Sequence, residues 1–308
     1  MGDLSFSVVI PVYNSMAFLP DALEAVKAQS IKAAEIIIVD SENCQKTADL
    51  AKQYNASCYN IANNIAEKRN FGANKASSDI VVFLDSDCLL PESWLAAAGQ
   101  FFAKAEIVAC GCSYFELPEN SHFLVQAWHQ HQIAFQKEQT AWLPTSALAV
   151  RKKIFNEISG FNERLPACED VDLGYRLNNH GLLVDSQKLS HIHLNNPDSL
   201  FLFFTKEYWR GQHSFELAIK NRSNLKEIIY LLIPLYAVAI LAAIIMFAIS
   251  FSSCALTLLL ITLSPIFALS LYVTSRTNSW LQMPALSLSY LMYLFARSTA
   301  FLRNMIHR

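Results

Sequence analysis

Two long stretches without a charged residue most constrain how this chain can fold. Residues 228–251 and 254–274 are 24 and 21 residues long, and neither contains Asp, Glu, Lys or Arg. A helix of about 20 apolar residues is long enough to cross the hydrocarbon core of a bilayer. The two stretches therefore predict a pair of transmembrane helices joined at Ser252-Ser253. A buried core hairpin is the alternative, which the length and the lack of charge disfavour.

Charge is divided unevenly along the chain. The 308 residues carry a formal net charge of −2, but residues 220–308 hold a single acid, Glu227, and a charge of +6, which leaves −8 for residues 1–219. The basic residues that flank the two predicted spans are Lys220, Arg222, Lys226 and Arg276. By the positive-inside rule both ends of the hairpin lie on the cytoplasmic side. We therefore expect a multi-pass protein of the cell (inner) membrane that binds the bilayer through its basic part, residues 220–308. Its acidic domain is expected to face the cytoplasm and, because phosphate contacts require basic residues, not to bind nucleic acid.

A third apolar stretch, from Trp280 to Leu302, contains Pro284 and Arg297. A third crossing would export the basic residues that follow it, against the charge rule. We therefore interpret it as a helix lying in the membrane interface, with a third span as the alternative.

The acidic part alternates short apolar strands with amphipathic helices. The strands are predicted at 6–10, 35–39, 56–61 and 80–84, and the helices at about 19–30, 46–54 and 65–76. This alternation is typical of an α/β protein with a parallel sheet and right-handed crossovers.

Asp85-Ser86-Asp87 directly follows the strand predicted at 80–84. Residues two apart on an extended chain point the same way, so both carboxylates can face one ligand. Ligands of open α/β sheets bind at the carboxyl ends of the strands. Two acidic oxygen donors there suit a hard divalent cation and the diphosphate that it neutralises. A solvated turn is the alternative for the motif taken alone.

Seven motifs follow one another in an order that resembles the family-2 inverting glycosyltransferases of the GT-A fold. The resemblance covers about residues 5–215, and the motifs are Val9-Ile10-Pro11-Val12-Tyr13-Asn14, Glu35-Ile36-Ile37-Ile38-Val39-Asp40, Arg69-Asn70-Phe71-Gly72-Ala73, Phe83-Leu84-Asp85-Ser86-Asp87-Cys88, Leu148-Ala149-Val150-Arg151-Lys152, Ser159-Gly160-Phe161-Asn162-Glu163 and Glu169-Asp170-Val171-Asp172-Leu173-Gly174-Tyr175-Arg176-Leu177. It implies a Rossmann-like, mostly parallel GT-A catalytic domain at residues 1–219 and a helical membrane region at 220–308.

The resemblance also implies a nucleotide-diphosphate sugar donor and a Mg²⁺ or Mn²⁺ ion. Asp87 would ligate the metal, and Asp85 would contact the donor ribose or the metal's waters. Ser86, which lies between them in the sequence, would also belong to the donor-binding residues. Asp40 would contact the nucleobase, although Asp40-Ser41-Glu42-Asn43 departs from the usual Asp-Asp-Gly-Ser and leaves uridine and guanosine both open. The other donor-binding residues implied are Pro11, Tyr13 and, near the diphosphate, Arg69. A solvated helix face is the alternative for Arg69.

Glu169-Asp170 resembles the family's acidic pair, in which the aspartate is the general base. N-terminal capping of the helix predicted at 170–179 is the alternative. A histidine is a third metal ligand in some relatives, and His191 fits that position slightly better than His193, with a surface histidine as the alternative.

Three functions compete. The first is a membrane-anchored inverting glycosyltransferase that adds sugar to a hydroxyl of a polyprenyl-linked saccharide in cell-surface glycan synthesis. The second charges a polyprenyl phosphate directly, but such enzymes often carry Gln-His-Pro after the acidic motif, where this chain has Cys88-Leu89-Leu90-Pro91. The third is a non-catalytic nucleotide-sugar-binding scaffold, which the intact acidic motifs disfavour.

Overall fold

The computed structural model describes residues 4–42, 44–165, 167–212 and 230–306, which form two compact units. One unit comprises residues 1–119 and 136–195, and the other comprises residues 120–135 and 196–308. This division differs from the domain boundary predicted at 219/220, because α5 (Phe123–Phe135) and α8 (Leu200–Gly211) group with the C-terminal helices. Lys220, Arg222, Lys226, the start of the first predicted span and Arg308 lie outside the described residues.

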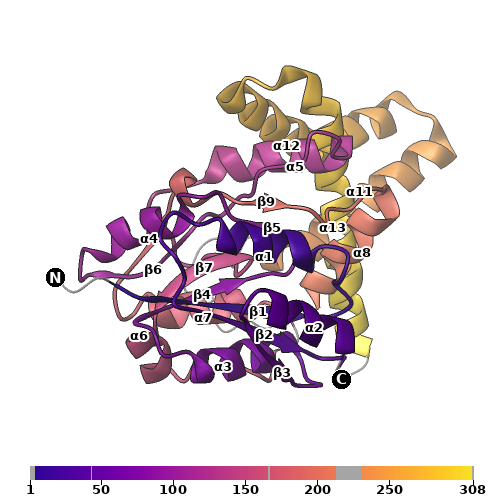
Figure 1. Cartoon of the computed structure of the whole chain (residues 1–308). Coiled ribbons are helices and arrows are strands. Elements are labelled where there is room, and N and C mark those ends of the chain that lie inside the picture. Colours follow the sequence, from indigo (N-terminus) through magenta and orange to yellow (C-terminus); the bar gives the residue numbers. More distant parts are fainter. Residues whose placement is uncertain (1–3, 43, 166, 213–229, 307–308) are drawn as a thin grey trace. The chain divides into compact units, whose positions relative to one another are not determined.

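The first unit is built on a mostly parallel seven-stranded sheet of order β3-β2-β1-β4-β7-β6-β8, which confirms the predicted fold class (Figure 1). β7 is antiparallel to both of its neighbours, and the other pairs are parallel. The strands are β1 (Phe6–Val12), β2 (Glu35–Asp40), β3 (Ser57–Asn60), β4 (Ile80–Leu84), β6 (Ile107–Gly111), β7 (Ala147–Arg151) and β8 (Leu182–Asp185).

Helices connect these strands, and the four that begin at Leu19, Gln45, Ile65 and Glu169 lie close to the predicted positions. The connecting helices are α1 (Leu19–Lys27), α2 (Gln45–Gln53), α3 (Ile65–Lys75), α4 (Trp94–Phe102), α6 (Lys152–Glu157) and α7 (Glu169–Leu177). β8 ends at Asp185, because Ser186 caps a 3₁₀ turn, η1 (Gln187–Leu189), by accepting from the Lys188 N–H.

The central strands are apolar because both faces of the sheet are covered. Every residue of β1 and β4 is buried. α3 lies close against β1, since a Cβ added to Gly72 would approach Val9 Cγ1 to 2.3 Å. Pro11 is tolerated in β1 because β4 pairs only as far as Val9, so Pro11 has a neighbour on one side alone. This packing brings the carboxyl ends of β1, β2 and β4 to one edge of the sheet.

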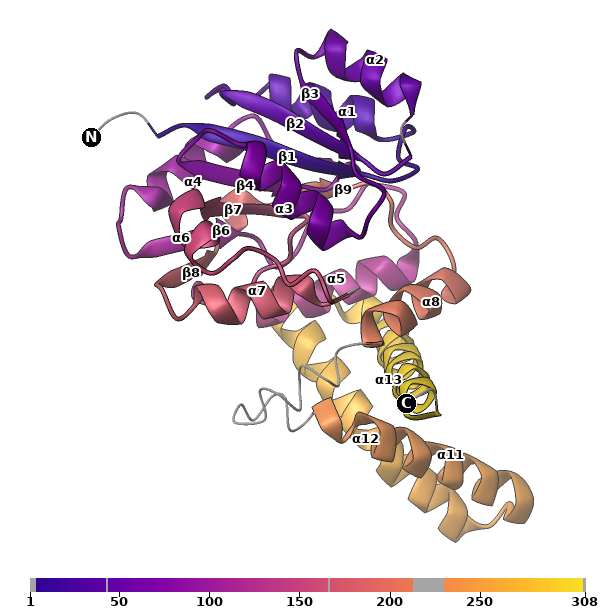
Figure 2. The same cartoon turned by 90° about the horizontal axis from the view of Figure 1, so that it is seen from below.

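The second unit contains three helices long and apolar enough to cross a membrane, by length and composition, among the residues described. α11 (Ile233–Ser250) and α12 (Ser253–Thr277) form a hairpin, and α13 (Met283–Ile306) follows a 3₁₀ turn, η2 (Trp280–Gln282) (Figure 2). At the hairpin tip Phe251 adopts a left-handed conformation and the Ser252 hydroxyl accepts from the Ala255 N–H. Whether α13 spans or lies in the interface stays a prediction.

Candidate functional site

Arg69 lies between two of the predicted site carboxylates. α3 carries Arg69, Asp85 directly follows β4, and Glu169 begins α7. The guanidinium donates from one terminal nitrogen to Asp85 Oδ1 and from the other to Glu169 Oε1, both at 2.7 Å. The Arg69 side chain is 2% exposed, so burial opposes its charge, yet Asp85 and Glu169 outweigh that effect and raise its pKa. Arg69 is therefore a buried cation that fixes two acids at the edge of the sheet, and the solvated alternative is excluded.

The three acids at the start of α7 have different surroundings. Glu169 is buried against Arg69, and Asp172 is buried against Arg176, whose NH2 lies 2.7 Å from Asp172 Oδ2. Arg176 also donates to the carbonyls of Ile158 and Gly160, so this pair ties α7 to the preceding loop. Asp170 is only half-buried, and its Oδ1 accepts from the Val171 N–H. Asp170 is thus the acid of the three that solvent and a substrate can reach most readily.

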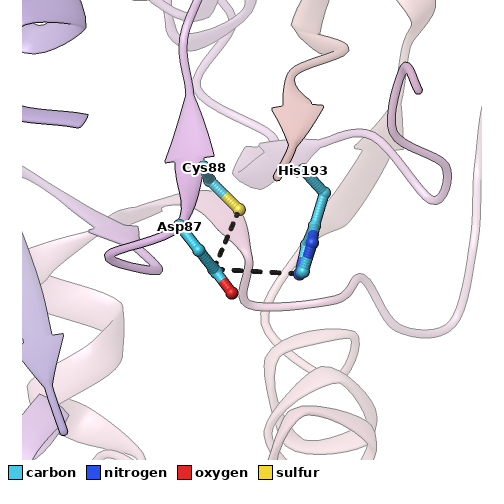
Figure 3. A group of neighbouring side chains, drawn as sticks. All are labelled: Asp87, Cys88 and His193. Carbon is cyan, nitrogen blue, oxygen red and sulfur yellow. Dashed lines mark hydrogen bonds and ion pairs between the residues drawn. The ribbon is translucent and has the colours of Figure 1, made fainter. Parts of the chain in front are cut away.

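Asp87 lies beside His193, because two short strands bring them together (Figure 3). β5 (Cys88–Leu89) pairs antiparallel with β9 (Ile192–His193), in a register that sets Cys88 opposite His193. His193 Nε2 is 3.8 Å from Asp87 Oδ1, and the candidate ligand atoms of Asp87, Cys88 and His193 lie within 4.8 Å of one another.

The donor set of this cluster fits a hard or borderline divalent cation. Burial, reinforced by Asp85 and Asp87, raises the pKa of the Cys88 thiol well above its usual value, so without a metal the thiol is protonated and donates toward Asp87 Oδ1. A carboxylate oxygen and an imidazole nitrogen remain, which are ligands compatible with Mn²⁺. A metal here would be held by Asp87 and His193.

His191 occupies a different environment from the one predicted for it. It is 1% exposed, and neither ring nitrogen has a hydrogen-bond partner among the residues that the structure describes. Burial, with a smaller contribution from His193, lowers its pKa to about 3. The reason is local: β9 begins only at Ile192, and His191 is held in the preceding turn, where its carbonyl accepts from the Glu116 N–H. His193 therefore replaces His191 as the histidine next to Asp87.

The predicted nucleobase residue, Asp40, organises the loop that follows β2. It is 2% exposed, and its two carboxylate oxygens accept from the backbone N–H groups of Glu42 and Cys44. The carboxylate thereby holds the turn that leads into α2. Pro11 is buried within β1, and Ser86 is buried beside Asp85.

Lys68 is a site residue that the sequence reasoning missed. Its ammonium donates to the Val12 carbonyl at 3.1 Å and to Ser41 Oγ at 3.0 Å, and it lies 5.8 Å from the centre of the exposed Tyr13 ring. Burial, and then the charge of Arg69, lower its pKa. The sequence did indicate Lys68 in one respect, because it is a second basic residue next to Arg69. A Lys on a helix, however, usually lies on a solvated face. Lys68 joins the ends of β1 and β2 under Tyr13.

A mostly parallel α/β sheet with acidic groups following its strands is the architecture of a GT-A fold, and this is the class of the first unit. Residues 7–159 match the profile of the family described as Glycosyl transferase family 2, and the chain belongs to that family.

Curated relatives agree with this assignment. The chain is 25% identical over 192 residues to the O-antigen chain rhamnosyltransferase RfbN of Salmonella typhimurium, covering 56% of this chain and 61% of that protein. It is 27% identical over 221 residues to an uncharacterized glycosyltransferase of Haemophilus influenzae, with 65% and 69% covered. It is 29% identical to a validoxylamine A glucosyltransferase of Streptomyces hygroscopicus, with 57% and 52% covered. The chain thus spans less than two thirds of the length of RfbN and of the Streptomyces protein.

Solved structures show the same fold. The mannosyltransferase PcManGT from Pyrobaculum calidifontis, solved in complex with GDP-Man and Mn²⁺, aligns with a TM-score of 0.68 at 15% identity and covers 99% of this chain and 88% of its own. GalNAc-T7, solved with UDP, GalNAc and Mn²⁺, aligns with a TM-score of 0.51 at 14% identity and covers 70% and 51%. At these identities the likeness concerns the fold alone.

Proposed function

We propose that this protein is a membrane-anchored, metal-dependent, inverting glycosyltransferase. It moves a sugar from a nucleotide-diphosphate sugar to a hydroxyl of a polyprenyl-linked saccharide in cell-surface glycan synthesis. The observation that carries the proposal is the division of the acids on α7. Glu169 and Asp172 each bind a buried or half-buried arginine, whereas Asp170 stays half-exposed at the helix start.

In the proposed reaction Asp170 acts as the general base. Its carboxylate takes the proton of the acceptor hydroxyl while that oxygen attacks the anomeric carbon of the donor. The bond from that carbon to the diphosphate oxygen breaks with its electron pair, the nucleoside diphosphate leaves, and the configuration inverts. Proton removal by a positioned base typically contributes about 10²–10⁴-fold to the rate. Arg69 holds Asp85 and Glu169 in fixed positions beside the reacting groups.

The leaving diphosphate carries charge that the acidic unit cannot neutralise by itself. Asp87 and His193 would hold a Mg²⁺ or Mn²⁺ ion, which supplies Lewis-acid stabilisation of the diphosphate when bound. Lys68 and Tyr13 lie at the ends of β1 and β2, where the base and ribose of the donor are expected to bind. The GDP-Man and Mn²⁺ in the PcManGT structure, and the UDP and Mn²⁺ in the GalNAc-T7 structure, support this donor and metal class.

Two observations support the membrane-linked glycan acceptor. The three apolar helices of the second unit are long enough to hold the protein in a bilayer, with the catalytic unit on the cytoplasmic side by the charge rule. The relative RfbN carries the name of an O-antigen chain rhamnosyltransferase, which is consistent with a cell-surface glycan as the product.

The decisive test compares two neighbouring acids. The protein, reconstituted in vesicles of bacterial lipid extract, is offered a panel of nucleotide sugars with Mn²⁺, and nucleotide release is measured. We expect Asp170→Asn to lower kcat about 10²–10⁴-fold with little change in the donor KM. Asp172→Asn, the matched control, loses an ion pair to Arg176 and lowers stability more than kcat.

The alternative outcomes are informative. If the parent protein releases nucleotide from no donor, the proposal fails. If Asp170→Asn loses less than about tenfold while Asp87→Ala is inactive, a phosphate acceptor, which needs less help from a base, replaces the saccharide hydroxyl.

A further inference from the structure

The second unit contains a partly open apolar cavity of about 300 Å³ that is lined by four helices. α5, α11, α12 and α13 all contribute to its wall, and the last three are the candidate membrane spans. One side of the cavity is aromatic: Trp128 stacks on Tyr293 with ring centres 5.2 Å apart, and Tyr290 packs edge-on against Trp128 at 6.0 Å. A volume of this size lies at the lower end of small-molecule sites.

Polar groups along the wall already have partners within the protein. His131 Nδ1 lies 2.8 Å from the Tyr290 hydroxyl, and burial lowers the pKa of His131 to about 4, so its ring is neutral at neutral pH. The Tyr236 hydroxyl donates to the Thr262 carbonyl on α12. These pairs leave a wall that suits an apolar occupant rather than water or a polar ligand.

Pro265 shapes the cavity from the α12 side. A proline inside a helix cannot donate to the carbonyl four residues earlier, here that of Ile261. The Ser264 hydroxyl donates to this carbonyl at 2.8 Å and so satisfies it within the helix. The interruption in α12 is therefore stable in an apolar setting, and Pro265 and Leu269 both line the cavity.

A basic cluster lies directly behind the aromatic wall. Arg297 Cζ is 4.9 Å from the centre of the Tyr293 ring, and Arg297 donates to Glu207 Oε2 at 2.8 Å. Glu207 is shared with Arg210, whose side chain is about half-exposed. Two guanidinium groups around one carboxylate leave a formal charge of +1. The cavity and the cluster together match a molecule with an apolar chain and an anionic head.

We propose that this cavity binds the first isoprene units of the lipid-linked acceptor, with the acceptor's phosphate beside the Arg210–Glu207–Arg297 cluster. The choice of an isoprenoid over other chains rests on the proposed function, whose acceptor is polyprenyl-linked. Aromatic faces provide broad, rigid contacts for the methyl groups and double bonds of such a chain. α5 and α13 would then serve acceptor recognition as well as anchorage.

The test is photolabelling of the full chain in vesicles of phosphatidylethanolamine and phosphatidylglycerol. A diazirine-bearing polyprenyl phosphate is the probe, and labelled peptides are mapped by mass spectrometry. We expect label on peptides of α12 and α13, removed by unlabelled polyprenyl phosphate but not by added phosphatidylglycerol. Leu269→Trp fills the cavity and should cut this labelling about tenfold. Leu271→Trp, an exposed position on the same helix, should leave it unchanged.

Two results would overturn the assignment. In the first, phosphatidylglycerol removes the label as well as unlabelled polyprenyl phosphate does. In the second, Leu269→Trp is labelled as strongly as Leu271→Trp while both variants keep the unfolding profile of the parent. Nucleotide release by the unmodified protein is measured in the same vesicles. Specific labelling without nucleotide release from any donor would refute the proposed function and leave the lipid site standing. Nucleotide release without specific labelling would refute the lipid site and leave the proposed function standing.

Discussion

The two units of this protein contain opposite arrangements of the same two ionic groups. In the first unit one guanidinium, Arg69, is shared by the carboxylates of Asp85 and Glu169. In the second unit one carboxylate, Glu207, is shared by the guanidinium groups of Arg210 and Arg297. Both clusters are buried at their centres, since the side chains of Arg69 and Glu207 are 2% and 3% exposed.

The difference lies in the charge that each cluster leaves over. The Arg69 cluster carries a formal charge of −1 beside Asp87, so its unit gains from a bound cation that also attracts an anionic donor. The Glu207 cluster carries +1, which favours anionic lipid groups near the membrane helices. In each cluster the buried central ion is shared by two groups of opposite charge, so the cluster keeps one uncompensated charge. The sign of that charge determines whether the unit attracts a cation or an anion.

The largest effect is expected from Arg69→Met. It leaves Asp85 and Glu169 without their buried cation, and removing one partner of a buried pair costs about 3–5 kcal/mol. We expect denaturant unfolding of the first unit at correspondingly lower concentration, and loss of nucleotide release. Lys75→Met, on the same helix, serves as the control, because within the described part of the chain the Lys75 ammonium lies over the rings of Tyr59 and Phe71 and forms no ion pair. A stable, active Arg69→Met protein would contradict the role given to the cluster.

Glu207→Gln tests the opposite cluster, with an expected loss of about 3 kcal/mol in the second unit, because the buried Arg297 and the half-exposed Arg210 lose their counter-charge. Hydrogen exchange of α8 in vesicles measures it, and Arg210→Gln, at the exposed partner, should cost less than about 1 kcal/mol.

The same residue predicts a pH dependence. Burial alone would raise the pKa of Glu207, but Arg210 and Arg297 outweigh burial and lower it. A lowered folded-state pKa means that this stability is present above the unfolded value of about 4.3 and is lost as the pH falls below it. Protection of α8 should therefore decrease below about pH 4 in the parent and stay flat in Glu207→Gln.

His193→Ala tests whether the negative cluster works with a bound cation. Chelation should abolish nucleotide release and added Mn²⁺ should restore it. The variant should need at least about tenfold more Mn²⁺, which corresponds to about 1.4 kcal/mol of lost binding free energy. His191→Ala is the control, because that buried ring should affect stability and leave the Mn²⁺ requirement unchanged. The reverse pattern would return the ligand role to His191.

Ser159→Gly should produce the smallest effect. Ser159 has a φ of +63°, a conformation that glycine adopts without the Cβ clash. We expect the first unit to gain about 0.5 kcal/mol in denaturant unfolding, with the second unit unchanged. An unchanged first unit would show that the Ser159 side chain offsets its own strain.

Much of the fold follows from local pattern, and the chain shows where that information ends. Buried strands such as β1 and β4 are continuous apolar runs, and α11 and α12 carry no charge except Arg276 in the last turn of α12, so periodicity and length were sufficient to predict them. The antiparallel position of β7 between β4 and β6 was not predicted, because strand order depends on long-range pairing that a short apolar segment does not encode.

The candidate site divides in the same way. Asp85 and Asp87 were predicted because they follow a buried strand, and Glu169 and Asp170 were predicted because they resemble the family's acidic pair. The role of Lys68 and the burial of Arg69 were not predicted, because their hydrogen-bond partners are distant in the sequence. Lys68 donates to the Val12 carbonyl and Arg69 donates to Glu169. The choice between His191 and His193 depended on the β5–β9 register, which two-residue strands do not reveal in sequence.

The β5–β9 ribbon also has a consequence for chain assembly. Asp87 and His193 are 106 positions apart in the sequence and meet only when that ribbon has paired. Closing a loop of this length is entropically costly, and an ion that binds both ends selects the folded chain over the open one. Metal supply would then govern how much of the protein persists in a cell, and metal starvation would lower its abundance as well as its turnover.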